Sequence, residues 1–292
     1  MLRVHRHSSL LERTSIRTGG RSRLLAEPEE LGELCTLLAR LEASGIPYFV
    51  LGGGTNTLFP DRELEGAVIS MRRLDAVTAL GEGVLEAEAG LPLRRLIRLA
   101  IRNGWGGLEN LVGIPGTVGG AVHGNAGGGD ASIGEHVDAV LLLDRRGEGK
   151  WVPGPDLPWS YRYSGIGGRV IARVRLRLHD RMPPSELKRA AQRIFERKLR
   201  SQPLGARSAG CVFRNPPGES AGRLIDVAGL KGARVGDAQV SLRHANFIVN
   251  QGQASGGDVR ELMAHVRDRV RDTFGISLDE EIITPRWRWG RR

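Results

Sequence analysis

The feature that most constrains the fold is a glycine-rich segment in the middle of the chain, GLENLVGIPGTVGGAVHGNAGGG, at residues 107–129. Within it, glycines occupy positions 113, 116, 119, 120, 124 and 127. Fixing a glycine costs conformational entropy, but the missing side chain lets the backbone approach a ligand closely. A plain turn does not need this many glycines. We therefore interpret the segment as a cradle for a cofactor.

A second glycine cluster, LGGGTNTLFPD at residues 51–61, follows an apolar stretch that predicts a buried strand. A dinucleotide-binding fingerprint would have to open directly into a helix whose N-terminus holds the pyrophosphate. Here Pro60 and Asp61 come almost at once, and no amphipathic helix follows. We therefore exclude a Rossmann loop and interpret the cluster as a turn whose successive backbone N–H groups can bind a phosphate.

The chain is long enough to bury a substantial core. With 292 residues, 40% of them hydrophobic, we expect two or three lobes. Two cysteines make no disulfide framework, which indicates a reducing compartment. The basic N-terminus lacks the apolar centre of a signal peptide, and no run approaches the roughly 20 apolar residues of a membrane helix. We expect a cytoplasmic protein without a membrane partner.

The net charge of +10 raises the question of nucleic-acid binding. Nucleic-acid binders usually concentrate basic residues on one face or tail and add aromatic side chains for stacking. In this chain the arginines are spread along the whole length, and aromatic residues are only 5%. We therefore expect no nucleic-acid partner. Arginine also suits the phosphates and carboxylates of small ligands, although for most of these residues a solvated surface position is the simpler interpretation.

Hydrophobic periodicity predicts the helices and strands. Helices are expected at 27–45, 92–104, 185–200, 220–228 and 257–275, and strands at 47–51, 66–71, 84–89, 137–144, 168–178 and 239–252. Pro183 and Pro184 mark a boundary, and the tail at 286–292 is expected to be unstructured. This order of elements indicates α+β lobes rather than a regular βαβ array. Cys35 falls on the apolar face of the first helix, so we expect it in the core.

Several motifs together resemble one enzyme family. They are VLGGGTNTL, GLENLVGIPGTVGGAVHGNAGG, YRYS, SAGCVFRNPPGESAGRLID, GLKGARVGDAQVSLRHANFIVN and LDEEI. In this order they resemble the motif series of UDP-N-acetylenolpyruvoylglucosamine reductase, also called UDP-N-acetylmuramate dehydrogenase, a flavoenzyme of peptidoglycan synthesis. The match runs from about Thr14 to Ile283, nearly the whole chain. A single glycine loop would be a weak signal, whereas the ordered series is highly specific.

The resemblance implies an α+β fold, with a two-lobed FAD-binding region of the vanillyl-alcohol-oxidase (PCMH) type and a C-terminal α+β substrate-binding lobe. It implies FAD lobes at 1–70 and 71–183 and the substrate lobe at 184–292. It also implies bound FAD, NADPH as co-substrate, a UDP-sugar nucleotide substrate and no metal. The chain resembles the shorter branch of the family, which lacks a tyrosine-bearing insertion over the active site. We expect a monomer.

By the same resemblance, the two glycine clusters line the FAD pyrophosphate and isoalloxazine. The positions implied are Gly52, Gly53, Gly54, Thr55, Asn56, Gly113, Pro115, Gly116, Thr117, Gly119, Gly120, Asn125, Ala126 and Gly127. The chain departs from the usual pattern in three places: Thr55 replaces a serine, HGN lacks a preceding methionine, and GGGDASIG lacks a tyrosine after NAG. These departures concern individual flavin contacts, not flavin binding.

Cys211 stands where the family usually has serine, in a stretch that Gly210 and Pro216 mark as a loop. The resemblance implies that flavin N5 passes a hydride from NADPH to C3 of the enolpyruvyl ether, after which C2 needs a proton. A thiol, with a reference pKa of about 8.5, gives up a proton far more readily than an alcohol does. Cys211 is therefore predicted to be the proton donor. The alternative is a buried, inert cysteine.

Arg162 in YRYS and Glu281 in LDEEI match the other two catalytic positions of the family. An arginine fork can neutralise a developing enolate and its carboxylate, and a carboxylate can orient water or share a proton. Asn215 is expected to contact the substrate phosphate or sugar. Taken alone, each residue could instead be an ordinary surface or ion-paired side chain. An alternative function is that of another FAD-dependent oxidoreductase of the same fold with a different substrate.

Overall fold

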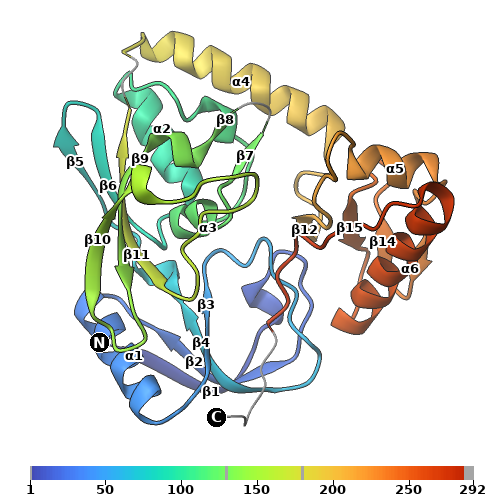
Figure 1. Ribbon diagram of the computed structural model, residues 1–292, viewed down its shortest axis with the longest axis horizontal. Coiled ribbons are helices and arrows are strands. Elements are labelled where there is room, and N and C mark those ends of the chain that lie inside the picture. Colours follow the sequence, from blue (N-terminus) through green and yellow to red (C-terminus); the bar gives the residue numbers. More distant parts are fainter. Residues whose placement is uncertain (1, 129–130, 179–180, 286–292) are drawn as a thin grey trace. The chain divides into compact units, whose positions relative to one another are not determined.

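The computed structural model describes residues 2–128, 131–178 and 181–285 (Figure 1). The N-terminal strands β1 (Arg3–Ser9), β2 (Arg21–Glu27), β3 (Tyr48–Leu51) and β4 (Leu64–Ser70) form a sheet in the order β1-β2-β4-β3, with β3 and β4 parallel. Helix α1 (Leu31–Ala43) connects β2 to β3. As the sequence predicted, the glycine loop after β3 does not open into a helix.

The chain divides into two compact units. Unit 1 comprises Met1–His5, Leu25–Gly53 and Ala67–Lys198, and unit 2 comprises Arg6–Leu24, Gly54–Gly66 and Leu199–Arg292. The division runs through the first glycine cluster, between Gly53 and Gly54. The assignment of two FAD lobes and a substrate lobe, with boundaries after residues 70 and 183, stays a prediction.

Unit 1 is built around a five-stranded antiparallel sheet in the order β10-β9-β11-β6-β5. Its strands are β5 (Val77–Gly81), β6 (Val84–Glu88), β9 (Val137–Leu143), β10 (Gly149–Pro153) and β11 (Val170–Arg177). Strand β11 follows the predicted alternation: Val174 and Leu176 are buried, whereas Arg175 and Arg177 pair with Glu86 and Asp138. Helices α2 (Leu93–Arg102), α3 (Val118–His123) and α4 (Pro184–Ser201) and the short pair β7 (Gly127–Gly128) and β8 (Ala131–Ser132) also begin in this unit.

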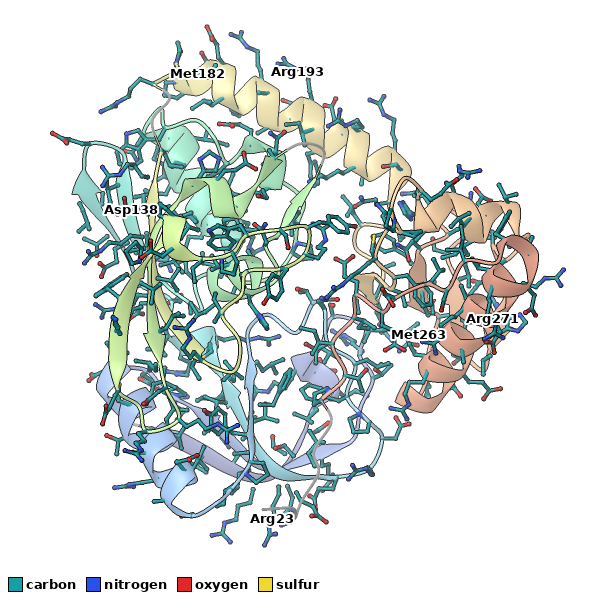
Figure 2. All side chains as sticks on the ribbon, in the orientation of Figure 1. Arg23, Asp138, Met182, Arg193, Met263 and Arg271 are labelled. Atoms are coloured by element: carbon teal, nitrogen blue, oxygen red, sulfur yellow. The ribbon has the colours of Figure 1, made fainter. Side chains whose placement is uncertain are left out.

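Unit 2 contains a four-stranded antiparallel sheet in the order β12-β15-β14-β13. The strands are β12 (Ser208–Cys211), β13 (Arg234–Val235), β14 (Ala238–Val240) and β15 (Phe247–Asn250), with helices α5 (Ala221–Val227) and α6 (Gly256–Phe274). Helix α6 begins with a capping box between Ser255 and Asp258. Its buried stripe includes Met263 in the core of the unit, while Arg271 is ion-paired with Asp268 (Figure 2).

Three sequence expectations are wrong in detail. The predicted strand at 239–252 is two strands, β14 and β15, separated by a turn in which the Ser241 hydroxyl accepts hydrogen bonds from the backbone N–H groups of Arg243 and His244. Cys35 is half-buried rather than in the core, because Leu34, Leu37, Leu38 and Leu41 are the residues of α1 that are buried. Helix α1 is also shorter than predicted, so Pro28 precedes it. The tail at 286–292 lies outside the described residues.

Candidate functional site

The two glycine clusters contact each other within unit 1. A Cβ atom on Gly52 would lie 2.6 Å from Thr117 Oγ1, and one on Gly53 would lie 2.7 Å from Gly116 Cα. The Gly53 carbonyl accepts a hydrogen bond from Arg72 Nη2 at 2.9 Å. Side chains at these positions would push the two loops apart, which explains why both contain glycine.

The second glycine cluster contains a helix that the sequence did not predict, because its glycines are poor helix formers. Helix α3 begins after Thr117, whose side chain accepts a hydrogen bond from Gly120 N at 3.3 Å and caps the helix. Gly119 packs on Ala89, where a Cβ would lie 2.7 Å from Ala89 Cβ. Gly120 is exposed, and a Cβ there would meet only Thr117 Oγ1, at 3.4 Å. The exposed face of α3 is therefore free of large side chains at Gly120.

Arg162 lies in a tight hairpin of unit 1, in which Ser160 and Tyr163 exchange two backbone hydrogen bonds of 3.0 Å. Its φ of +57° is in the left-handed region, which is uncommon for a residue with a side chain. The guanidinium donates from Nη1 to the Gly127 carbonyl at 3.2 Å and lies over the Tyr161 ring, 5.0 Å from its centroid. Arg162 is therefore linked directly to the end of the second glycine cluster.

Lys198 belongs to the same unit, and no sequence motif marked it. Lys198 lies on the same face of α4 as the apolar residues Leu187, Ala191 and Ile194. A lysine at an apolar position of an amphipathic helix is the sequence feature that could have singled it out. Its Nζ donates to the carbonyls of Asn110 at 3.0 Å and Val112 at 2.7 Å. Burial, followed by the positive charges of Arg197 and Arg162, lowers the pKa of Lys198 to about 8.

Acylation of the holoenzyme with a small amine-reactive reagent should therefore mark Lys198 early. The rate at Lys198 should rise up to about pH 8 and then level off, because about half of an amine with that pKa is neutral at pH 8. An N-acetyl-lysine amide control should keep rising to about pH 10. Peptide mass spectrometry of the four lysines gives the site-specific rates. A Lys198 rate that follows the control up to pH 10 would contradict the lowered pKa.

Cys211 is the last residue of β12 rather than part of a loop, so the sequence expectation was wrong there; the strand pairs with Phe247 of β15. The next residue, Val212, accepts the backbone N–H of Glu281 at 2.8 Å. On the other side, the Asn56 side chain donates to the Glu281 carbonyl at 3.1 Å, and the Asn56 carbonyl accepts from Ile283 N at 3.0 Å. Unit 2 thus brings Asn56, Cys211 and Glu281 onto adjacent backbone segments.

The two neighbouring carboxylates of the LDEEI motif have different surroundings. Glu280 forms an ion pair with Arg267 of α6, with 3.1 Å between Arg267 Nη1 and Glu280 Oε1. Glu281 is half-buried, and its backbone is held by Val212 and Asn56. Asn215, predicted to contact substrate, is exposed, and its side-chain oxygen accepts the N–H of Ala221 at 3.1 Å, at the start of α5.

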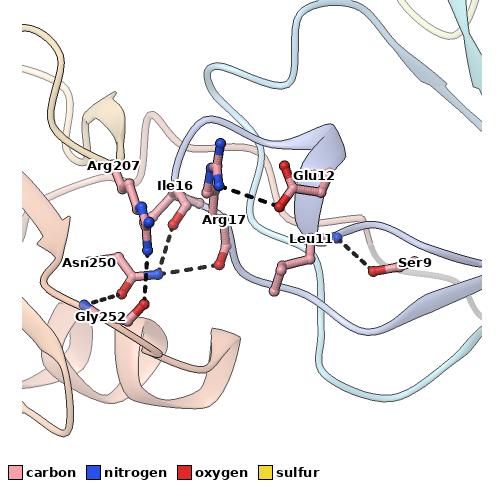
Figure 3. A network of polar contacts seen from close by, with 8 residues as sticks. All are labelled: Ser9, Leu11, Glu12, Ile16, Arg17, Arg207, Asn250 and Gly252. Carbon is pink, nitrogen blue, oxygen red and sulfur yellow. Dashed lines mark hydrogen bonds and ion pairs between the residues drawn. The ribbon is translucent and has the colours of Figure 1, made fainter.

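The N-terminal segment of unit 2 is hydrogen-bonded to Asn250, the last residue of β15 (Figure 3). Asn250 Nδ2 donates to the carbonyls of Ile16 and Arg17 at 3.0 and 3.2 Å, and Asn250 Oδ1 accepts a hydrogen bond from Gly252 N at 3.0 Å. Ser15 N donates to the Gly54 carbonyl at 3.0 Å. This bond ties the N-terminal segment to Gly54, whose φ is +67°.

The residues predicted for catalysis are therefore distributed over both units. Arg162 belongs to unit 1, and Cys211 and Glu281 belong to unit 2. The predicted flavin positions are likewise divided, with Gly52, Gly53 and residues 113–127 in unit 1 and 54–56 in unit 2. Gly120 presents exposed backbone with room for a bound cofactor, whereas at Gly52, Gly53 and Gly119 a Cβ would meet protein atoms, so those glycines allow the close packing that shapes the two clusters.

Comparison with known proteins defines the class first. A family model described as an FAD binding domain matches residues 22–152, which include both glycine clusters. The chain is thus a flavin-dependent oxidoreductase that binds FAD, as predicted.

A second family model, described as the UDP-N-acetylenolpyruvoylglucosamine reductase C-terminal domain, matches residues 202–284. The reductase of that name from Syntrophobacter fumaroxidans is 42% identical over 94% of this chain and 82% of its own length. The one from Synechococcus sp. (strain JA-3-3Ab) is 41% identical over 92% and 87%. A crystal structure of the Thermus caldophilus enzyme (MurB) has a TM-score of 0.84 at 38% identity, covering 97% of this chain and 99% of that one. The chain belongs to the UDP-N-acetylenolpyruvoylglucosamine reductase family.

These findings confirm the predicted fold class, an α+β protein with a PCMH-type FAD-binding region, and a place among the peptidoglycan-synthesis flavoenzymes. The roles of individual site residues stay predictions. Within 2–128, 131–178 and 181–285, no helix is both long and apolar enough to cross a bilayer.

Proposed function

We propose that the chain reduces the enolpyruvyl group of UDP-N-acetylglucosamine enolpyruvate to UDP-N-acetylmuramate, with NADPH as co-substrate. The observation that carries the proposal is the adjacency in unit 2 of Cys211, Glu281 and the flavin-loop residue Asn56. The relatives from Syntrophobacter fumaroxidans and Thermus caldophilus are reductases of an enolpyruvyl sugar by name, which supports the same substrate class.

The reaction adds a hydride to C3 and a proton to C2 of the enolpyruvyl double bond, while NADPH becomes NADP⁺. FAD, held by Gly52–Asn56 and residues 113–127, would accept the hydride from NADPH and supply it to C3. Cys211 would donate its thiol proton to C2 and regain one from water. Arg162 would neutralise the substrate carboxylate and the charge that grows beside it during hydride addition.

Glu281 would orient water or share a proton with the reacting centre. Glu281 is assigned this role because its backbone is bonded to Val212, next to Cys211, and to the Asn56 side chain. Asn215 would contact the substrate phosphate or sugar from the loop before α5. Localisation in the cytoplasm, where NADPH and UDP-sugars are made, and a monomeric state are part of the proposal.

An anaerobic two-step experiment tests the function. NADPH should bleach the flavin absorbance of the holoenzyme, and subsequent UDP-N-acetylglucosamine enolpyruvate should restore it with formation of UDP-N-acetylmuramate. A flavin that is reduced by NADPH but stays reduced in the presence of the enolpyruvyl nucleotide would contradict the substrate assignment.

Flavin retention tests the glycine positions. Gly120→Val should lower the flavin content of the purified protein strongly while leaving it folded, because a side chain there has room in the protein and would project from the exposed face of α3. Gly119→Val is the matched contrast: it meets Ala89 and should lower thermal stability as well. Two measurements are needed: the ratio of the flavin absorbance at about 450 nm to the protein absorbance at about 280 nm, and the melting temperature. A stoichiometric flavin content in Gly120→Val would remove that position from the cofactor site.

A further inference from the structure

The hairpin that carries Arg162 has a backbone that its own sequence does not favour. Arg162 has a φ of +57°, a region in which Cβ crowds the backbone, so surrounding contacts must hold the residue there. The segment 123–127 supplies three such contacts. The His123 carbonyl accepts from Ser164 Oγ at 2.8 Å, Asn125 Nδ2 donates to the Ser160 carbonyl at 2.9 Å, and the Gly127 carbonyl accepts from Arg162 Nη1 at 3.2 Å.

Of these three contacts, only that of Asn125 uses a side chain of the glycine-rich segment; the other two use the backbone carbonyls of His123 and Gly127. Asn125 is only 5% exposed. Its Nδ2 bonds to Ser160, and its Oδ1 accepts the Gly134 N–H at 3.1 Å, so both polar atoms are used inside unit 1. Asn125 itself has a φ of +41°, which asparagine tolerates better than most residues do. The Ser160 carbonyl that it binds also accepts the Tyr163 N–H that closes the hairpin.

We infer that Asn125 is a positioning residue, which fixes the guanidinium of Arg162 by clamping the 160–163 hairpin to the glycine-rich segment. The inference rests on the proposed role of Arg162 in the reaction. The resemblance implies that Asn125 is a cofactor contact, which stays a prediction; its side-chain amide bonds to the hairpin and to Gly134. Loss of the clamp would let the left-handed hairpin relax and would move the arginine fork away from its place.

Two variants isolate the clamp. Asn125→Gly removes both side-chain bonds while keeping a residue that adopts positive φ without strain. Asn125→Asp keeps the acceptor for Gly134 N–H and places a carboxylate oxygen against the Ser160 carbonyl, where a donor is needed. Asn103→Gly is the control, since Asn103 also donates to a backbone carbonyl, that of Leu99, at the end of α2.

The kinetic test is a double-mutant cycle with Arg162→Lys, measured as the rate of substrate-driven reoxidation per bound flavin. Asn125→Gly and Asn125→Asp should each slow this step about tenfold or more in the wild-type background, and less than about twofold once Arg162 is lysine, because residues that act as a unit are not additive. If the Asn125 variants slow reoxidation by the same factor in both backgrounds, the inference is overturned and the proposed function is not affected. Wild-type turnover in Arg162→Lys would overturn the proposed role of Arg162 and the inference with it.

Hydrogen exchange gives a readout that does not depend on turnover. In the holoprotein, the amide of Tyr163 should exchange at least about tenfold faster in Asn125→Gly than in Asn103→Gly. The reason is that the Ser160 carbonyl, which accepts this N–H, no longer receives the hydrogen bond from Asn125. Peptides from α6 should exchange equally in both variants, which shows that the fold is retained. Unchanged exchange at Tyr163 would show that Asn125 does not hold the hairpin and would overturn the inference.

Discussion

Replacing Cys211 with alanine should slow reoxidation of the reduced enzyme by the enolpyruvyl nucleotide by about 100-fold or more, the usual contribution of a positioned acid. Reduction of the flavin by NADPH should stay near the wild-type rate, because the thiol acts only when C2 accepts its proton. Cys211→Ser restores the residue usual in the family and should keep a substantial part of the activity. Stopped-flow absorbance of the two half-reactions separates these effects. Wild-type reoxidation in Cys211→Ala would reduce the thiol to a packing role.

Alkylation provides an independent check on the same thiol. Inactivation by iodoacetamide should speed up as pH rises, since the thiolate is the reactive form, and bound substrate should protect. Cys35 is the internal control: burial raises the pKa of its thiol, so it should be alkylated slowly. Peptide mapping identifies the modified residue. Inactivation that tracks labelling of Cys35 instead of Cys211 would contradict the assignment.

The glycine clusters were predictable from sequence because their chemistry is local. A run of glycines predicts close backbone approach whatever the tertiary structure, and the two clusters do approach each other closely at Gly53 and Gly116; contact with a cofactor at these positions stays a prediction. Elements whose existence depends on a partner were missed. Strand β1 is exposed along nearly its whole length and shows no apolar alternation, so only its pairing with β2 makes it a strand.

The same distinction applies to the site. Cys211 looked like a loop residue because Gly210 and Pro216 flank it, whereas pairing with β15 extends the sheet to the thiol. The polar connections could not be predicted, because each joins residues far apart in the chain: Lys198 to the 110–112 carbonyls, and Asn56 to Glu281. Their donors and acceptors can be identified in the sequence, but their partners are set only by the fold.

Arg162→Lys should lower turnover by about tenfold or more, although the charge is kept. Arg162 presents a planar fork, with Nη1 on the Gly127 carbonyl and the guanidinium over Tyr161, and lysine has neither the fork nor the flat face. A guanidinium held in a fixed orientation can bind a substrate carboxylate through paired N–H groups as the neighbouring charge develops, without reorganising during the reaction. The loss should appear in kcat and in kcat/KM for the enolpyruvyl nucleotide.

Lysine is a suitable replacement because it has the same β-carbon substitution as arginine, so the φ of +57° is equally strained in both proteins and backbone effects cancel. Arg175→Lys is the matched control, since Arg175 also lies over an aromatic ring, that of Trp151, and pairs with Glu86 on the five-stranded sheet. It should leave turnover near the wild-type value. NADPH-driven flavin reduction should continue in Arg162→Lys, because the arginine is assigned to the substrate carboxylate. Equal turnover in the two lysine variants would remove Arg162 from the mechanism, whereas a defect confined to Arg162→Lys would tie the reaction to the fork geometry rather than to positive charge alone.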